Sequence, residues 1–201
     1  MNLKSLGTEK HRHIAGVDEA GRGPLAGPVV VSAVILPARH ALIGLDDSKR
    51  LTRERRESLF PEIKQQAVSW AIECVDVEEI DRLNILRATL MGMRRAVLAL
   101  DPMPGMALVD GNRAPELSCE VRTIIEGDHW VPAISAASVL AKVTRDAIMR
   151  DWHEAYPVYG FDHNKGYPTP EHLECLREHG PCPIHRRSFA PVREALSPAL
   201  F

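Results

Sequence analysis

The chain has 201 residues, which is enough for one domain with a substantial core and a small appendage. Apolar residues make up 45% and charged residues 26%, and the formal net charge of −2 excludes a protein that binds nucleic acid through its overall charge. Any contact with nucleic acid must therefore depend on a local basic patch.

Membrane and export signals are not evident in the sequence. No apolar run approaches the roughly 20 residues that span a bilayer, and the N-terminal stretch MNLKSLGTEKHRH lacks the apolar core of a signal peptide. We therefore expect a cytoplasmic protein. The four cysteines form no C-x-x-C pair, and we expect free thiols.

Apolar runs in the first part of the chain predict three strands. They cover residues 14–19, 29–36 and 67–75. The polar loop 45–52 ends at Thr52, which can cap a helix over about 53–66. From about 77 to 100, apolar residues recur at helical spacing, which predicts one amphipathic helix.

The second part of the chain predicts strands at 106–110 and 121–128, a long helix from Pro132 to about Ala155, and a short helix over about 170–178. The order β-β-α-β-α-β-β-α indicates an α/β protein with a mixed sheet flanked by helices, not a doubly wound parallel sheet.

The predicted domain boundary lies near Tyr156 and Pro157. It divides the chain into a main domain, 1–156, and a small C-terminal helical extension, 157–201, packed on that domain.

Three of the predicted strands end in acids, namely Asp18 with Glu19, Asp110, and Asp128. Strand ends at one edge of a sheet can bring distant residues together, and like charges gathered there repel each other. A divalent cation with hard oxygen ligands, Mg²⁺ or Mn²⁺, would resolve that repulsion. Any one acid alone could simply solvate a strand end, but the set favours a metal site.

Asp18 and Glu19 pose a geometric difficulty, because adjacent strand residues point to opposite faces. Their carboxylates can meet only if the strand ends or bulges there, and Glu19 could instead offer its backbone carbonyl. The turn Gly21-Arg22-Gly23 follows at once and could supply the break.

Two other motifs suggest different functions. GRGPLA, residues 21–26, matches a dinucleotide-binding fingerprint, but a strand pattern follows it where a helix is required, so we reject that interpretation. A set of metal-ligand types lies near the C-terminus: His172, Cys175, His179, Cys182 and His185. The spacing matches no common zinc pattern, and a helix with Cys175 packed inward and its histidines in solvent is favoured.

Several blocks, taken in order, resemble the ribonuclease H type 2 family in its bacterial ribonuclease HII form. The blocks are AGVDEAGRGPLAGPVV, LDDSKRLT, NILRAT, LVDGN, EGDHWVPAISAASVLAKVTRD, NKGYPTPEH and HRRSFAPV. They cover roughly residues 14–192, and the combination of the first and fifth blocks is highly specific.

The resemblance implies a ribonuclease H-like fold and an endonuclease that cuts the RNA strand of RNA–DNA hybrids. It also implies cutting on the 5′ side of single ribonucleotides in duplex DNA, by two-metal hydrolysis with Mn²⁺ or Mg²⁺, leaving 3′-hydroxyl and 5′-phosphate ends. The role would be removal of ribonucleotides from DNA. We expect a monomer, with no sliding-clamp motif evident after Arg187.

The family's four acids fall on Asp18, Glu19, Asp110 and Asp128. Asp146 ranks below Asp128 as the fourth, because we expect it to pair with Arg145, Arg150 or nearby backbone.

The same resemblance places substrate contacts on the turn Gly21, Arg22 and Gly23, whose backbone would sense the ribose 2′-hydroxyl. Tyr167 would pack on the sugar of the following deoxynucleotide.

Phosphate contacts are expected from Lys49 and from a polar stripe on the long helix. The stripe comprises Ser135, Ser138, Lys142 and Arg145. Arg186 and Arg187 are weaker candidates. Two alternatives remain open, a module that binds hybrids without cutting them and a zinc-stabilised structural protein.

Overall fold

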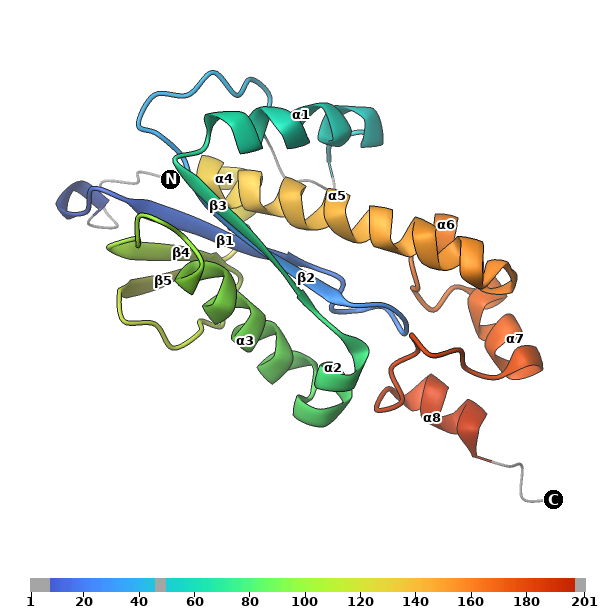
Figure 1. Cartoon of the computed structure of the whole chain (residues 1–201). Helices are drawn as coiled ribbons and strands as arrows, with labels where there is room; N and C mark the ends of the chain where they lie inside the picture. Colours follow the sequence, from blue (N-terminus) through green and yellow to red (C-terminus); the bar gives the residue numbers. More distant parts are fainter. Residues whose placement is uncertain (1–7, 46–49, 198–201) are drawn as a thin grey trace.

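The computed structural model describes residues 8–45 and 50–197 (Figure 1). A five-stranded sheet forms its centre, in the order β3-β2-β1-β4-β5. The strands are β1 Ile14–Ala20, β2 Val29–Ile35, β3 Ser69–Val75, β4 Met106–Asp110 and β5 Glu120–Ile124. β2 is antiparallel to both its neighbours, whereas β4 is parallel to β1 and β5. The mixed sheet flanked by helices is thus confirmed.

Helices cover both faces of this sheet (Figure 1). They are α1 Arg53–Gln66, α2 Val77–Leu83, α3 Ile85–Leu98, α4 Gly127–Trp130, α5 Pro132–Ala155, α6 Phe161–Asn164, α7 Pro170–His179 and α8 Ala190–Leu196, with 3-10 turns η2 Thr8–Lys10 and η3 Pro157–Tyr159. α1 and α5 lie on one face, and α2 and α3 lie on the other. None of the helices in the described ranges is long and apolar enough to cross a membrane.

The core has two layers because the central strands are apolar on both faces. All seven residues of β2 are buried. Val31 packs into the cluster with α3, and Val34, three residues further along β2, packs into the cluster with α1 and α5. The side chains of one strand therefore hold both helical layers in place.

Gly16 in β1 allows α5 to approach the sheet closely. A Cβ atom at this position would lie 2.1 Å from the backbone carbon of Ala133, so only glycine fits. The contact presses the first turn of α5 onto β1 two residues before Asp18. It thereby fixes the helix over the acidic end of the strand.

The prediction of one helix over 77–100 is wrong, because the structure divides it at Asn84. This residue has a φ of 68° and caps α3, its Oδ1 accepting from the amides of Leu86 and Arg87 at 3.1 Å each. Asn tolerates positive φ better than most residues, so the chain turns here. Apolar spacing continues across the break, which is why periodicity missed it.

The region after Tyr156 packs against both α5 and the loop that joins β1 to β2. Phe161, Tyr159 and Ile184 share a buried cluster with Ala26 and Met149. The division of the chain after Tyr156 stays a prediction.

Candidate active site

Asp18 and Asp110 lie on neighbouring parallel strands. Val17 of β1 pairs with Val109 of β4, so the next residue on each strand is an acid. Asp18 is 5% exposed, and Asp110 is the last residue of β4. The sheet register therefore brings two carboxylates together at the same end of two neighbouring strands, as the strand-end argument predicted.

Asp128 reaches the same place by a different route. The predicted strand 121–128 is too long: β5 ends at Ile124, and Glu126 takes a left-handed φ of 57° before α4 begins. Asp128 is thus on a short helix, not at a strand end. The amide of Gly127 donates to Asp110 Oδ1 at 2.7 Å, which ties this turn to β4.

The three aspartates form one cluster. One carboxylate oxygen each from Asp18, Asp110 and Asp128 lie within 4.8 Å of one another. Burial raises the pKa of Asp18 well above its usual value, and the nearby charges of Glu19 and Asp110 raise it further, against the hydrogen bond from Ser138. Hard oxygen donors in mutual repulsion fit a divalent cation of the Mg²⁺ or Mn²⁺ kind.

Glu19 is near this cluster without belonging to it. β1 continues through Ala20, so no strand break turns the Glu19 side chain beside that of Asp18. Its Oε1 accepts from Arg22 Nη1 at 3.2 Å, and its amide donates to Asp18 Oδ1 at 2.7 Å. The structure therefore brings together three of the four predicted acids, with the fourth lining the pocket beside them.

A pocket of about 290 Å³ opens next to Asp18. It is lined by Asp18, Glu19, Ala20, Gly21, Arg22, Gly23, Ser138, Lys142, Arg145 and Tyr167. Six of the eight predicted substrate residues line it. Ser135 does not, because its buried hydroxyl donates to the carbonyl of Asp128. Lys49 lies outside the described residues.

The turn after β1 forms one wall of the pocket, and Tyr167 stands opposite it. Gly21 has a φ of 98°, and a Cβ there would lie 2.0 Å from Arg145 Nε. At Gly23 an added Cβ would meet only the Tyr167 ring, at 3.4 Å. Tyr167 is 46% exposed. Gly21 is thus required by packing, whereas Gly23 leaves open space facing the tyrosine.

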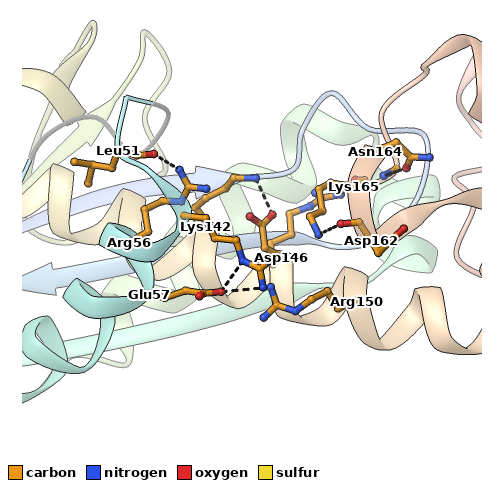
Figure 2. Close-up of polar contacts among 12 residues, drawn as sticks. Leu51, Arg56, Glu57, Lys142, Asp146, Arg150, Asp162, Asn164 and Lys165 are labelled. Atoms are coloured by element: carbon orange, nitrogen blue, oxygen red, sulfur yellow. Dashed lines mark hydrogen bonds and ion pairs between the residues drawn. The ribbon is translucent and has the colours of Figure 1, made fainter.

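Lys142 is held in place by Asp146 at a distance of 2.7 Å (Figure 2). The expected partners of Asp146 are engaged elsewhere. Arg150 pairs with Glu57 (Figure 2), at a distance of 3.6 Å, and Arg145 binds backbone carbonyls. Asp146 therefore orients a lysine at the pocket wall and is not a fourth member of the acid cluster.

Arg145 and Arg186 are not available for phosphate contact, which corrects their expected role. They are 1% and 0% exposed, and both donate to the carbonyls of the loop between β1 and β2. Burial lowers the pKa of Arg145 to about 10 and that of Arg186 to about 9. The sequence around Arg145 and Arg186 contains no signal that predicts this binding to backbone carbonyls.

The His and Cys residues of 172–185 do not bring three ligand atoms together; among the described residues, the aspartate cluster is the single group of three or more converging metal-ligand side chains. The prediction that the histidines of this helix lie in solvent is wrong for His172, which is buried. Its Nε2 lies 3.0 Å from Nε2 of His185. The two rings bind each other in the core of the C-terminal region.

A mixed five-stranded sheet with carboxylates converging at its centre, beside a pocket with cationic walls, defines a phosphodiester-cleaving enzyme of the ribonuclease H-like class. Comparisons with known proteins agree. The family model described as Ribonuclease HII matches residues 15–192, and the chain belongs to this family. It is thus a hydrolase of the ribonuclease H type, and its acidic cluster is compatible with metal-dependent catalysis.

The relatives match along most of their length. Ribonuclease HII of Bordetella avium is 61% identical over 180 residues, covering 90% of this chain and 89% of the relative. The Burkholderia mallei protein of the same name is 57% identical over 182 residues, covering 90% and 85%. The crystal structure of ribonuclease H2 from Pyrococcus horikoshii superposes with a TM-score of 0.79 at 28% identity, covering 91% of this chain and 96% of that one.

Proposed function

We propose that the protein hydrolyses the RNA strand of RNA–DNA hybrids and cuts on the 5′ side of single ribonucleotides embedded in duplex DNA. The products would carry 3′-hydroxyl and 5′-phosphate ends, and the cellular role would be removal of ribonucleotides from DNA. The convergence of Asp18, Asp110 and Asp128 beside the pocket is the observation that carries this proposal.

Two divalent ions, Mn²⁺ or Mg²⁺, would be held by Asp18, Asp110 and Asp128, with Glu19 at the edge of the cluster. When bound, such ions activate a water molecule and stabilise the leaving 3′-oxygen. The hydroxyl of Ser135 donates to the carbonyl of Asp128 and so fixes the turn that carries this acid.

The pocket walls would bind the substrate around the scissile phosphate. Lys142, oriented by Asp146, presents an ammonium group for a phosphate oxygen, and Ser138 lies one turn earlier on α5. Backbone of the Gly21–Gly23 turn can approach a ribose 2′-hydroxyl, the group that distinguishes RNA from DNA at one nucleotide. Tyr167 would pack on the sugar of the next deoxynucleotide.

The test uses a labelled DNA duplex carrying one ribonucleotide, an RNA–DNA hybrid and an all-DNA duplex, each with Mn²⁺, Mg²⁺ or chelator. We expect one metal-dependent cut on the 5′ side of the ribonucleotide, cutting of the hybrid, and an intact all-DNA duplex. Binding of the hybrid without any cleavage would contradict the proposal and favour a non-catalytic binding module.

A further inference from the structure

We infer that two consecutive residues, His185 and Arg186, act as positioning residues that set how the Gly21–Gly23 turn and Tyr167 face each other. The inference rests on the proposed function, because it takes this turn and this tyrosine to be the parts that contact the sugars of the substrate. Neither His185 nor Arg186 is exposed enough to touch the substrate itself, at 1% and 0%.

The side chain of Arg186 fixes the turn through its backbone. Its Nη2 donates to the carbonyl of Gly21 at 2.5 Å, its Nη1 to that of Arg22 at 3.0 Å, and Nε and Nη2 to that of Gly27 at 3.0 and 2.8 Å. Within the described residues, no carboxylate lies within ion-pair distance of this guanidinium. A planar fork of donors suits several carbonyls at once, a task for which lysine has the wrong geometry.

Backbone pairing fixes the register of this clamp. The amide of Arg186 donates to the carbonyl of Leu25 at 2.8 Å, and the amide of Gly27 donates to the carbonyl of Ile184 at 2.8 Å. Between them, Ala26 and His185 form an antiparallel bridge. The segment therefore lies along the loop between β1 and β2 like a short extra strand, and its side chains cannot slide relative to the turn.

The side chain of His185 reaches Tyr167 through His172. The Nε2 atoms of the two rings lie 3.0 Å apart, and His172 Nδ1 lies 2.8 Å from the carbonyl of Tyr167. At the other end, the amide of Cys182 donates to His185 Nδ1 at 3.0 Å.

The donors and acceptors in this row of hydrogen bonds determine the tautomers of His172 and His185. The carbonyl of Tyr167 only accepts, so His172 Nδ1 carries a proton and its Nε2 accepts. His185 Nε2 must then donate, which leaves its Nδ1 to accept from the Cys182 amide. With both rings neutral, every donor in this row of hydrogen bonds has an acceptor. The row therefore forms a rigid strut from Cys182 to Tyr167, in which each group donates in the same direction.

Both walls of the pocket are thus attached to neighbouring residues of one segment, whereas Asp18, Asp110 and Asp128 are placed by β1, β4 and α4. Loosening the segment should shift the sugar-facing walls and leave the acids where they are. Loss of the strut to Tyr167 should then reduce cutting at a single ribonucleotide, where the following sugar must be recognised, more than cutting of a long hybrid.

The experiment compares two substitutions of His185 on both substrates. His185→Gln can keep an amide donor toward His172 Nε2 where His185 Nε2 stood, whereas His185→Leu removes that donor. We expect His185→Gln to keep the parent's ratio of kcat/KM for the single ribonucleotide over the long hybrid, and His185→Leu to lower that ratio about tenfold or more. A ratio unchanged in a folded His185→Leu would overturn the role of the strut.

Arg186→Lys tests the clamp on the turn. We expect kcat/KM to fall about a hundredfold on both substrates, because a displaced turn affects every ribose that is read. The control is Arg94→Lys. Arg94 is exposed on α3, on the sheet face opposite to α5, and this variant should have the kcat/KM of the parent. Parent-like cutting by Arg186→Lys would refute the clamp.

The two proposals fail in different ways. If the parent protein does not cut the single ribonucleotide, the proposed function fails. If the parent cuts it and the variants fold and behave like the parent, the positioning role fails alone. Near-ultraviolet circular dichroism of each variant reports folding, and should Arg186→Lys not fold, the His185 pair still decides.

Discussion

Asp18 is a buried acid that is repelled by the negative charges of its neighbours Glu19 and Asp110. Burial raises the pKa of its carboxyl, and the charges of Glu19 and Asp110 raise it further, which favours the protonated form. A bound cation would reverse that preference, because an opposite charge stabilises the ionised carboxylate. Metal binding should therefore lower the pKa of Asp18, in the direction opposite to burial.

Asp110→Asn should remove cleavage while the fold survives. The amide oxygen can still accept from the Gly127 amide, but it gives up the negative charge that a divalent cation needs. We expect activity to fall at least about a thousandfold, the equivalent of about 4 kcal/mol. Cleavage assays and thermal unfolding measure the two effects, with Glu116→Gln as an exposed control. Normal activity in Asp110→Asn would end its assignment as a ligand.

Gly21→Ala and Gly23→Ala should separate packing from substrate access. At Gly21 the added methyl group collides with Arg145, and the backbone of residue 21 has a positive φ that alanine disfavours. We therefore expect the unfolding free energy to fall by about 3 kcal/mol. At Gly23 we expect a change within about 1 kcal/mol, yet reduced cleavage, because the methyl group stands in the pocket. Urea denaturation of both variants checks this; equal stabilities would contradict it.

Sequence reasoning placed Asp18 and Asp110 correctly because each ends an apolar run on a neighbouring strand. It misplaced Asp128 because the left-handed turn at Glu126 leaves no mark on hydrophobic periodicity. It also assigned Arg145 and Arg186 to phosphate. A basic residue reads the same in sequence whether it meets solvent or the carbonyls of a loop more than a hundred residues away.

At the scale of elements, the sequence predicted β1, β2, β4, α1 and α5 nearly to the residue. Their boundaries carry local signals, such as Thr52, whose hydroxyl accepts from the Arg55 amide, and Pro132 at the start of α5. The short elements α4, α6 and α8 were not predicted, because a helix of four to seven residues is stabilised by tertiary contacts and not by its own sequence.

The break between α2 and α3 offers a test at this scale. Asn84→Ala should lower the unfolding free energy by about 1 kcal/mol, since it removes the side-chain cap of α3 while it keeps a Cβ at positive φ. Asn84→Gly should lose clearly less, because glycine accepts that backbone. Guanidinium denaturation of the pair provides the measurement, and alanine as stable as glycine would refute the argument.

At the scale of the whole molecule, α5 is the element that unites the parts. Its first turn presses on β1 through Gly16, its middle carries Ser138 and Lys142 to the pocket, and its later part contributes Arg145 to the loop after β1. The buried pair His172 and His185 lies in the region after Tyr156 that packs against α5. Because both residues can take up a proton, this pair makes the stability of the whole molecule depend on pH.

Stability should fall as the solution is acidified. Burial, and then the neighbouring His172, lower the pKa of His185 to about 4, so the unfolded chain takes up a proton near pH 6.5 while the folded one does not. Stability from this group is complete above pH 6.5 and is lost toward pH 4. We expect about 2 kcal/mol of loss between pH 7 and pH 5.

The raised pKa of Asp18 acts in the opposite direction, because there the folded state binds the proton first. The difference between the parent and His185→Gln isolates the histidine. Chemical denaturation across this pH range should show a flatter slope in the variant, while His40→Gln, an exposed substitution, controls for the loss of one histidine. Parallel slopes for parent and His185→Gln would contradict the assignment.

The clamp between Arg186 and Gly21 joins residues 165 positions apart. During synthesis, the hairpin of β1 and β2 leaves the ribosome early, and the three clustered aspartates are all available once residue 128 has emerged. The Gly21–Gly23 turn receives its hydrogen bonds from Arg186 only when residue 186 has followed. A nascent chain thus holds all three acids before the turn beside them is fixed by Arg186.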